Sequence, residues 1–385
     1  MEFLELQDLV AAMGTCRYLH YLGLPILLRN MRLHFRDAEM YAARFELYRW
    51  LLLENPARFL CVSSLSCSVD ALYPGPEGSE AAVRSLPPKR GYSLVDFLPY
   101  LTRVRVLDIE MHEKPLPPSI YHWILSLQGL RKLTLRHVAK EAQPLLDLVA
   151  QLGRKELNAI AISIGQSSRL AVGPAFDPIS ALSSFSGSLK SLSIDWSDCH
   201  QAVVIPADAR HCYPAVQDLY WNTPQCIHIG ALIRAFPGAR NLRIGERALD
   251  RVVPPLYSGA ISERVMLAQR QRNLASQHDP RMRWPSLESL RGDPLVLWIL
   301  AIRCCVARLE TDLRSYRSRM GHLLSVLHDT TPVHLVLSLS AKAVVNLDRV
   351  FIVPSLQALE LTIDVHDQSD VLAMLVSRPA LYHTH

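Results

Sequence analysis

Apolar residues recur along most of the chain in one short pattern, in which an apolar position is followed by a second three residues later and a third two residues after that. Clear copies start at Val62, Val104, Leu130, Leu157, Leu189, Val216, Ala239 and Leu356, and weaker copies at Leu287, Val306 and His334. The nine steps from Val104 to Leu356 cover 252 residues, a mean spacing of 28. This regular spacing predicts a chain of stacked copies of one structural unit.

The positions between these apolar residues are mostly polar. Because successive side chains of a strand point to opposite faces, the alternation predicts short strands with one buried and one solvated face. A solvated strand face is available to a partner molecule. The candidate partner-contact residues on it are Lys132, Thr134, Arg136, Asp195 and Arg243.

Segments with helical spacing precede four of the predicted strands. They cover residues 117–127, 141–152, 177–185 and 225–236. Gly129, Gly153, Gly187 and Gly238 fall near their ends, where a residue of positive φ commonly closes a helix. A repeated unit of helix, turn and strand predicts an α/β solenoid, with parallel strands on the concave side and helices outside.

The strand pattern resembles that of leucine-rich-repeat proteins over roughly residues 56 to 365, since those repeats run about 20 to 29 residues. The repeat is degenerate, because the spacings include one of 48 residues (Ala239 to Leu287) and one of 19 (Leu287 to Val306). The resemblance implies a solenoid domain over residues 36–385, with insertions near 73–92 and 249–284. It also implies recognition of another protein, without enzymatic activity.

Residues 1–35 are expected to form a short helical segment. Cys16-Arg17-Tyr18-Leu19, followed by Leu24-Pro25-Ile26-Leu27-Leu28, resembles the second half of an F-box of the kind found in many fungal F-box proteins. The resemblance implies a substrate-recognition subunit of a Skp–cullin–F-box ubiquitin ligase, whose partners are a Skp-type adaptor and a target protein. The opening half of the motif is not matched, so a scaffold that has lost ligase coupling is the alternative. The candidates for docking the adaptor, or for capping the first repeat, are Leu9, Val10, Met13, Leu19, Leu24, Pro25 and Leu27.

The net charge of +5 is unevenly distributed. Between Arg264 and Arg319 eleven arginines stand against five acidic residues, a local charge of +6. We take Arg270, Arg272, Arg281 and Arg283 as candidates for contacting an acidic protein surface. Nucleic-acid binding is a weaker alternative, because few aromatic residues are interleaved with the arginines. The favoured interpretation is that the segment is an inert, solvated insertion.

The sequence lacks the usual signatures of an enzyme or a metal site. It contains no phosphate-binding glycine loop, nucleophile elbow or zinc-protease motif, so we expect no catalytic residue and no cofactor. An enzyme on an open α/β sheet is the rival class. Cysteine and histidine near residues 199–228 lack the paired spacing of zinc ligands. The vicinal Cys304-Cys305 pair is expected to be a packing feature rather than a redox centre.

The expected compartment is the cytoplasm or the nucleus. The chain starts with the acidic sequence Met-Glu-Phe-Leu-Glu, unlike a secretory signal, and its eight cysteines are scattered. The longest apolar run, residues 294–302, is far shorter than the roughly 18 residues that a membrane span requires.

Overall fold

The computed structural model describes residues 6–33, 48, 51–69, 97–111, 116, 118–138, 151, 156–164, 178–195, 211–222, 228–245, 259–313, 320–340 and 353–364. The chain forms two compact units, Met1–Ala171 and Val172–His385. This division does not coincide with the boundary expected at residue 35. The predicted insertion at 73–92 lies outside the described residues, as does the predicted helix 141–152 apart from residue 151.

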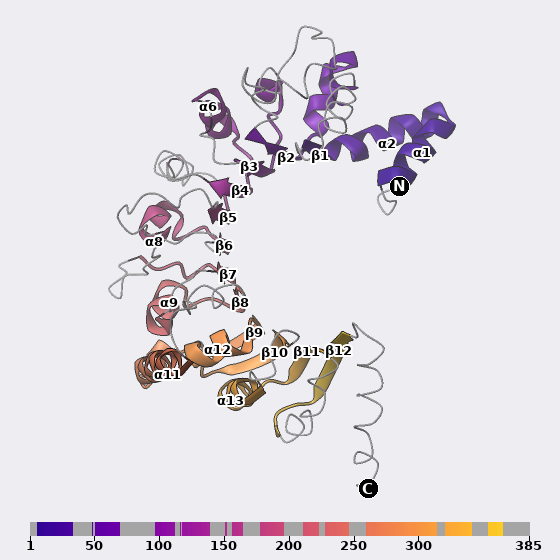
Figure 1. Cartoon of the computed structure of the whole chain (residues 1–385). Helices are drawn as coiled ribbons and strands as arrows, with labels where there is room; N and C mark the ends of the chain where they lie inside the picture. Colours follow the sequence, from indigo (N-terminus) through magenta and orange to yellow (C-terminus); the bar gives the residue numbers. More distant parts are fainter. Residues whose placement is uncertain are drawn as a thin grey trace. The chain divides into compact units, whose positions relative to one another are not determined.

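The first unit is built on parallel strands (Figure 1). In chain order, its described elements are α1 (Leu6–Thr15), α2 (Arg17–Arg29), β1 (Asn30–Leu33), η1 (Pro56–Cys61), β2 (Ser64–Ser68), η3 (Leu98–Tyr100), β3 (Val106–Glu110), α6 (Pro118–Ser126), β4 (Lys132–Val138) and β5 (Ala159–Ile164). Each strand pairs in parallel with the next. Leu65, Leu107, Leu133 and Ile160 lie in one row across the sheet, and all are buried. The strands predicted at the first four copies of the pattern are therefore confirmed.

Strand β1 was not predicted, because residues 1–35 were expected to be helical. Met31 and Leu33 are buried while Asn30 and Arg32 are exposed, which is the alternation of a half-buried strand. The strand is only four residues long, so the alternation was too short to recognise in the sequence. It pairs with β2 in parallel and ties the N-terminal helices to the sheet.

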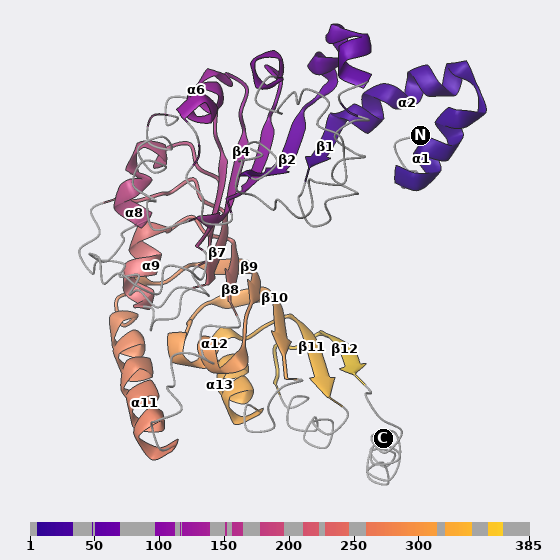
Figure 2. The same ribbon diagram turned by 45° about the horizontal axis from the view of Figure 1, so that its top comes forward.

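The second unit also contains only parallel strand pairs within its described part (Figure 2). Its elements are α8 (Pro178–Ala181), η5 (Ser183–Phe185), β6 (Ser191–Asp195), β7 (Asp218–Asn222), α9 (Ile229–Ala235), β8 (Asn241–Ile244), α11 (Gly259–Ser276), η6 (Pro280–Met282), β9 (Ser286–Arg291), α12 (Pro294–Leu300), β10 (Cys305–Asp312), α13 (Met320–Thr330), β11 (His334–Ser340) and β12 (Ala358–Asp364). Helices α9, α11, α12 and α13 lie on one side of the strands (Figures 1 and 2). The helices predicted at 117–127, 177–185 and 225–236 correspond to α6, α8 with η5, and α9.

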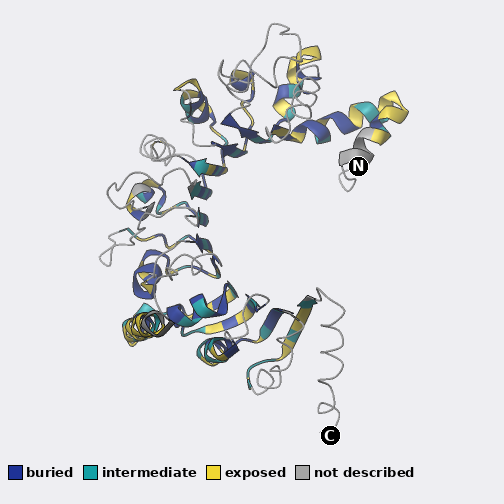
Figure 3. Ribbon diagram, in the orientation of Figure 1, coloured by how far each residue is buried: buried dark blue, intermediate teal, exposed yellow. Residues whose placement is uncertain are grey.

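A continuous row of leucines runs through the core of the second unit. Leu192, Leu219, Leu242, Leu290, Leu309, Leu335 and Leu359 are register partners on β6 to β12. The first six are buried and Leu359 is half-buried (Figure 3). The sequence pattern starting at His334 had placed Leu337 in this row, but Leu335 occupies it. Leu335 and Leu337 both face the core, so the pattern alone could not fix the register.

The glycines near the helix ends do not act as expected. No described glycine has a positive φ, which excludes that role for Gly129, Gly187 and Gly238, and Gly153 lies outside the described residues. At Gly238 the reason for glycine is close approach, because a Cβ atom there would lie 2.1 Å from the carbonyl oxygen of Pro214.

Candidate functional site

The solvated strand face of the first unit carries a short polar network. Asp108 on β3 is flanked in register by Ser66 on β2 and Thr134 on β4. Its Oδ2 accepts hydrogen bonds from Ser66 Oγ (3.2 Å) and from Arg136 Nη2 (2.5 Å). The predicted contact residues Lys132, Thr134 and Arg136 lie on this face as expected, with Lys132 and Arg136 exposed. The charge of Arg136 is balanced within the protein by Asp108.

The equivalent face of the second unit carries a more basic group of side chains. Tyr220, Arg243 and Arg291 are register partners on β7, β8 and β9, and Glu310 follows on β10. The guanidinium of Arg243 lies 5.0 Å from the centroid of the Tyr220 ring. Arg291 Nη1 lies 2.9 Å from Glu310 Oε1. The carboxylate of Glu310 is thus paired with Arg291, and among the described residues Arg243 makes no ion pair.

This arrangement, which we call the Tyr220–Arg243–Arg291 cluster, has a physical cost. Like charges placed opposite each other on neighbouring strands destabilise a sheet. The Tyr220 ring offsets part of the cost, because the face of an aromatic ring attracts a cation. An anion supplied by a ligand would offset more, since a guanidinium binds a carboxylate through two parallel hydrogen bonds. Tyr220 was not among the residues singled out in the sequence, because its contact with Arg243 depends on strand register.

Asp195 makes an internal contact in addition to its expected place on the solvated strand face. It is half-buried, and its Oδ1 accepts a hydrogen bond of 2.9 Å from Asn222 Nδ2 on the neighbouring strand. Asn222 is buried, and a Cβ atom on Gly245 would lie 1.9 Å from its Oδ1. Asp195 therefore orients a buried amide at the ends of the strands in addition to bordering the solvated face.

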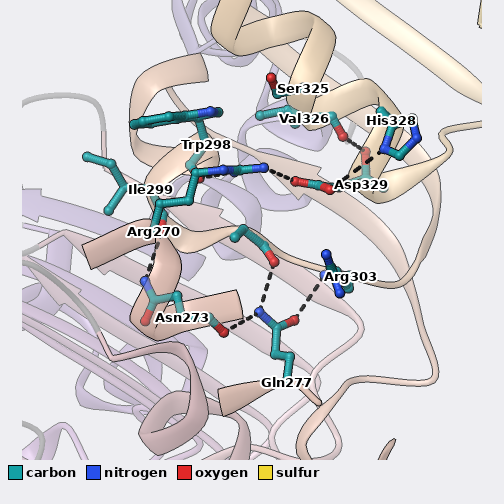
Figure 4. A network of polar contacts seen from close by, with 12 residues as sticks. Arg270, Asn273, Gln277, Trp298, Ile299, Arg303, Ser325, Val326, His328 and Asp329 are labelled. Carbon is teal, nitrogen blue, oxygen red and sulfur yellow. Dashed lines mark hydrogen bonds and ion pairs between the residues drawn. The ribbon is translucent and has the colours of Figure 1, made fainter. Parts of the chain in front are cut away.

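Arg270 does not lie on the contact surface where the sequence placed it. Its Nη2 donates to Asp329 Oδ2 on α13 at 2.6 Å, its Nη1 donates to the Trp298 carbonyl, and its guanidinium lies 5.1 Å from the Trp298 ring centroid (Figure 4). The side chains of Arg270 and Asp329 are only 12% and 10% exposed. The arginine joins α11 to α12 and α13, so it is a structural residue.

The other arginines of this segment are divided between surface and interior. Arg272 and Arg281 are exposed. Arg283 is half-buried, and its Nε donates to the carbonyl of Gln277. Arg272 and Arg281 therefore remain accessible to an acidic partner, and Arg283 is partly committed to an internal contact.

The N-terminal candidates are mostly internal. Met13, Leu24 and Leu27 are buried, Leu19 is half-buried, and Pro25 is exposed. Leu9 and Val10 lie in α1, but their side chains are outside the described set. Helix α2 packs against α1, η1 and β1. An N-terminal cap needs this burial, whereas an adaptor-docking surface needs exposure.

A different set of apolar side chains is exposed on α2. Tyr18 and Tyr21 are 71% and 69% exposed, and Leu22 is 46% exposed. Residues three and four apart on a helix lie side by side, so these three side chains form one patch. We call it the α2 patch. In the sequence it was hidden, because the apolar spacing of this helix did not distinguish its buried side from its exposed side.

Two of the described thiols, Cys67 and Cys304, have the properties of packing residues, whereas Cys305 is exposed. Burial raises the pKa of Cys67 from 9.0 to about 12, with a smaller contribution from the charge of Asp108. Burial, and then neighbouring Cys305, raises the pKa of Cys304 to about 12 as well. A reactive thiol needs a lowered pKa, because the thiolate is the nucleophile. Cys304 is thus a weak nucleophile at neutral pH.

No group of three or more histidine, cysteine or acidic side chains within the described ranges is arranged to hold a metal ion. His211, Cys212 and His228 are among those ranges, and Cys199, His200 and Cys226 are not. The described helices include none that is long and apolar enough to cross a membrane.

Comparison with protein-family models and with curated proteins finds no match to this sequence.

Proposed function

We propose that the protein is a non-enzymatic recognition module, a degenerate leucine-rich-repeat protein that binds a protein partner through the solvated strand face of its second unit. The observation that carries this proposal is the Tyr220–Arg243–Arg291 cluster. Its side chains project from three neighbouring strands, a rigid platform that holds contact residues in place before a partner binds. The regular spacing of the apolar pattern and the parallel pairing of the strands support the repeat assignment.

The residue types of the cluster suit a protein interface. Tyrosine and arginine are enriched among the few interface residues that contribute most of the binding energy. Tyrosine offers a large contact area at a small entropic cost, and arginine can pair with a carboxylate of the partner. The cluster carries two positive charges against one negative charge, which favours a partner with acidic side chains at the contact. We place this activity in the cytoplasm or nucleus.

We expect Arg243→Ser to weaken binding of the protein partner by about tenfold or more, because truncating a central interface arginine commonly costs above 1 kcal/mol. The partner would first be captured from a cell extract by the purified full chain, identified by mass spectrometry, purified and then titrated by calorimetry. Arg103→Ser is the matched control, since Arg103 is an exposed arginine in a turn of the first unit. Equal affinities of the wild-type chain and Arg243→Ser for every captured protein would contradict the proposal.

A second candidate function is coupling to a ubiquitin ligase through a Skp-type adaptor. The specific observation in its favour is the α2 patch, which lies on the helix that resembles part of an F-box. Three of the docking residues expected from the sequence argue against adaptor binding, because Met13, Leu24 and Leu27 are buried in the protein. Among the described side chains of α2, docking of the adaptor would therefore depend on Tyr18, Tyr21 and Leu22.

We expect the purified full chain to retain a Skp-type adaptor only weakly in a pull-down, because the surface available is small. Replacing Tyr18 and Tyr21 together by Ser should remove that binding, since both rings are exposed and their loss opens no cavity. Tyr100→Ser is the matched control, because Tyr100 is a 59% exposed tyrosine on η3 and not on α2. Tight, stoichiometric binding would restore the full ligase function. Binding that the double variant leaves unchanged would exclude the α2 patch.

A further inference from the structure

Helix α11 buries amide side chains where a surface helix usually buries apolar ones. On the side that faces the protein, Gln269 and Asn273 are buried, with 6% and 1% exposed. Val265 lies on the same helical row as Gln269 and Asn273 and is 58% exposed, whereas Leu267, on the side that faces away, is 45% exposed. A helix on a protein surface normally buries its apolar side. No described element of the second unit lies beyond α11 on the side away from α9 and α12 (Figures 1 and 2).

The buried side of α11 is held by hydrogen bonds to the ends of neighbouring helices. Asn273 Oδ1 accepts from the Ile229 N–H at the start of α9 (3.2 Å), and its Nδ2 donates to the Ile299 carbonyl in α12 (2.9 Å). Gln277, just after α11, donates to the Ala301 carbonyl (2.8 Å) and accepts from the Arg303 N–H (3.0 Å; Figure 4). These amides satisfy backbone groups that helix ends leave unpaired. The exposed side of α11 is thus presented on a fixed helix.

The exposed side has the geometry that a second helix needs. Residues at i, i+3, i+4 and i+7 frame a recess that accepts one side chain of a neighbouring helix. Helix α11 presents two such sets in succession, Arg264, Leu267, Ala268 and Gln271, and then Ala268, Gln271, Arg272 and Ala275, all of them exposed. The alanines leave room at the centre of each recess, and Leu267 supplies apolar contact at its edge.

The charges on this side indicate the kind of partner. Arg264 and Arg272 stand eight residues apart, about 12 Å along the axis at 1.5 Å per residue. Among the described residues neither has an ion-pair partner. A second copy of this chain would bring arginine against arginine, which disfavours self-association. A membrane surface is disfavoured too, because the exposed side has no aromatic side chain to enter the lipid interface.

We propose that the exposed side of α11 is a docking site for an amphipathic helix of a partner protein, with small or apolar side chains over Ala268 and acidic side chains opposite Arg264 and Arg272. This site is separate from the strand face, and it does not depend on the function proposed for that face. The partner helix would gain from the fixed position of α11, because little further ordering of the chain is required on binding.

The test uses the full chain and fluorescein-labelled synthetic peptides in anisotropy titrations. The probes are a panel of amphipathic helices with alanine and leucine on one side and glutamate along its borders, and the control peptides carry lysine in place of glutamate. We expect saturable binding of the glutamate peptides alone. The double variant Arg264→Ser, Arg272→Ser should weaken it about tenfold at low salt, with a smaller difference at high salt where exposed charges are screened.

Two further variants make the test specific. Ala268→Glu should abolish binding by filling the recess and repelling the acidic peptide. Alanine and glutamate are both good helix formers, so α11 itself should be preserved. Arg103→Ser should leave binding unchanged. Absence of binding, equal binding of the lysine peptides, or insensitivity to Arg264, Arg272 and Ala268 would overturn the proposal. The proposal would also be overturned if the chain associated with itself in sedimentation, or co-sedimented with vesicles of anionic lipid, and Ala268→Glu removed that behaviour.

Discussion

Replacing Asp329 by Ala should lower the free energy of unfolding by about 3–5 kcal/mol, because it leaves the guanidinium of Arg270 buried without its counter-ion. Arg270 Nη2 and Asp329 Oδ2 are 2.6 Å apart, and both side chains are largely shielded from water. The Trp298 carbonyl and ring remain as partners of Arg270, so the lower end of this range is the more reasonable value. Urea denaturation of wild type and variant, with comparison of midpoints and slopes, measures the difference.

Two controls separate the ion pair from general damage. The double variant Arg270→Met, Asp329→Leu should be more stable than Asp329→Ala, because replacing both partners of a buried pair by apolar side chains is often neutral. Glu288→Ala breaks a pair that is equally visible in the structure, Arg240 with Glu288 at 3.1 Å. Both side chains of the Arg240–Glu288 pair are more than half exposed, so Glu288→Ala should lower the free energy of unfolding by only about 0–1 kcal/mol. Similar losses for Glu288→Ala and Asp329→Ala would show that burial of the Arg270–Asp329 pair has no effect on stability.

Leu192→Ala should cost about 2–5 kcal/mol, the range for truncating a core leucine that leaves a cavity. Leu192 is 2% exposed and lies in register with Leu219 on β7. Its register partner Leu219 is also buried, so collapse into the cavity would require the strands β6 and β7 to move. Denaturant unfolding followed by circular dichroism gives the value.

Leu361→Ala is the matched control for this prediction. Leu361 belongs to the same sequence pattern, but it is 38% exposed on β12. Truncation removes less buried area there and leaves no closed cavity, so the loss should stay below about 1 kcal/mol. If Leu192→Ala cost as little as Leu361→Ala, the row of leucines through β6 to β11 would not form the main core of the second unit.

The candidate site was only partly predictable, and the reasons differ between residues. Arg243 could be placed on the solvated strand face because the strand alternation assigns it there. Tyr220 could not be connected with it, because the two lie on different strands and 23 residues apart in the sequence. Their contact depends on the register of β7 against β8. The position of Arg291 beside Arg243 depends in the same way on the pairing of β8 with β9.

The arginine-rich segment shows a second kind of limit. Composition identified a basic insertion, and α11 lies within its expected range of 249–284. Charge counting treats all arginines alike, whereas the structure buries Arg270 against Asp329 and leaves Arg272 exposed. Asp329 lies 59 residues further along the chain, so no local signal in the sequence relates the two residues.

The sequence by itself determined the elements that depend on local alternation. Strand positions from β2 to β12 followed from the apolar pattern, because side chains of a strand alternate with a period of two and only one face is buried. Tertiary structure alone decided the features that depend on pairing between distant segments. They are strand β1, the register of Leu335, the burial of Arg270 and the burial of Gln269 and Asn273 on α11. The physical reason is that solvent exposure and ion pairing are set by what packs against a residue, and that neighbour is usually remote in the sequence.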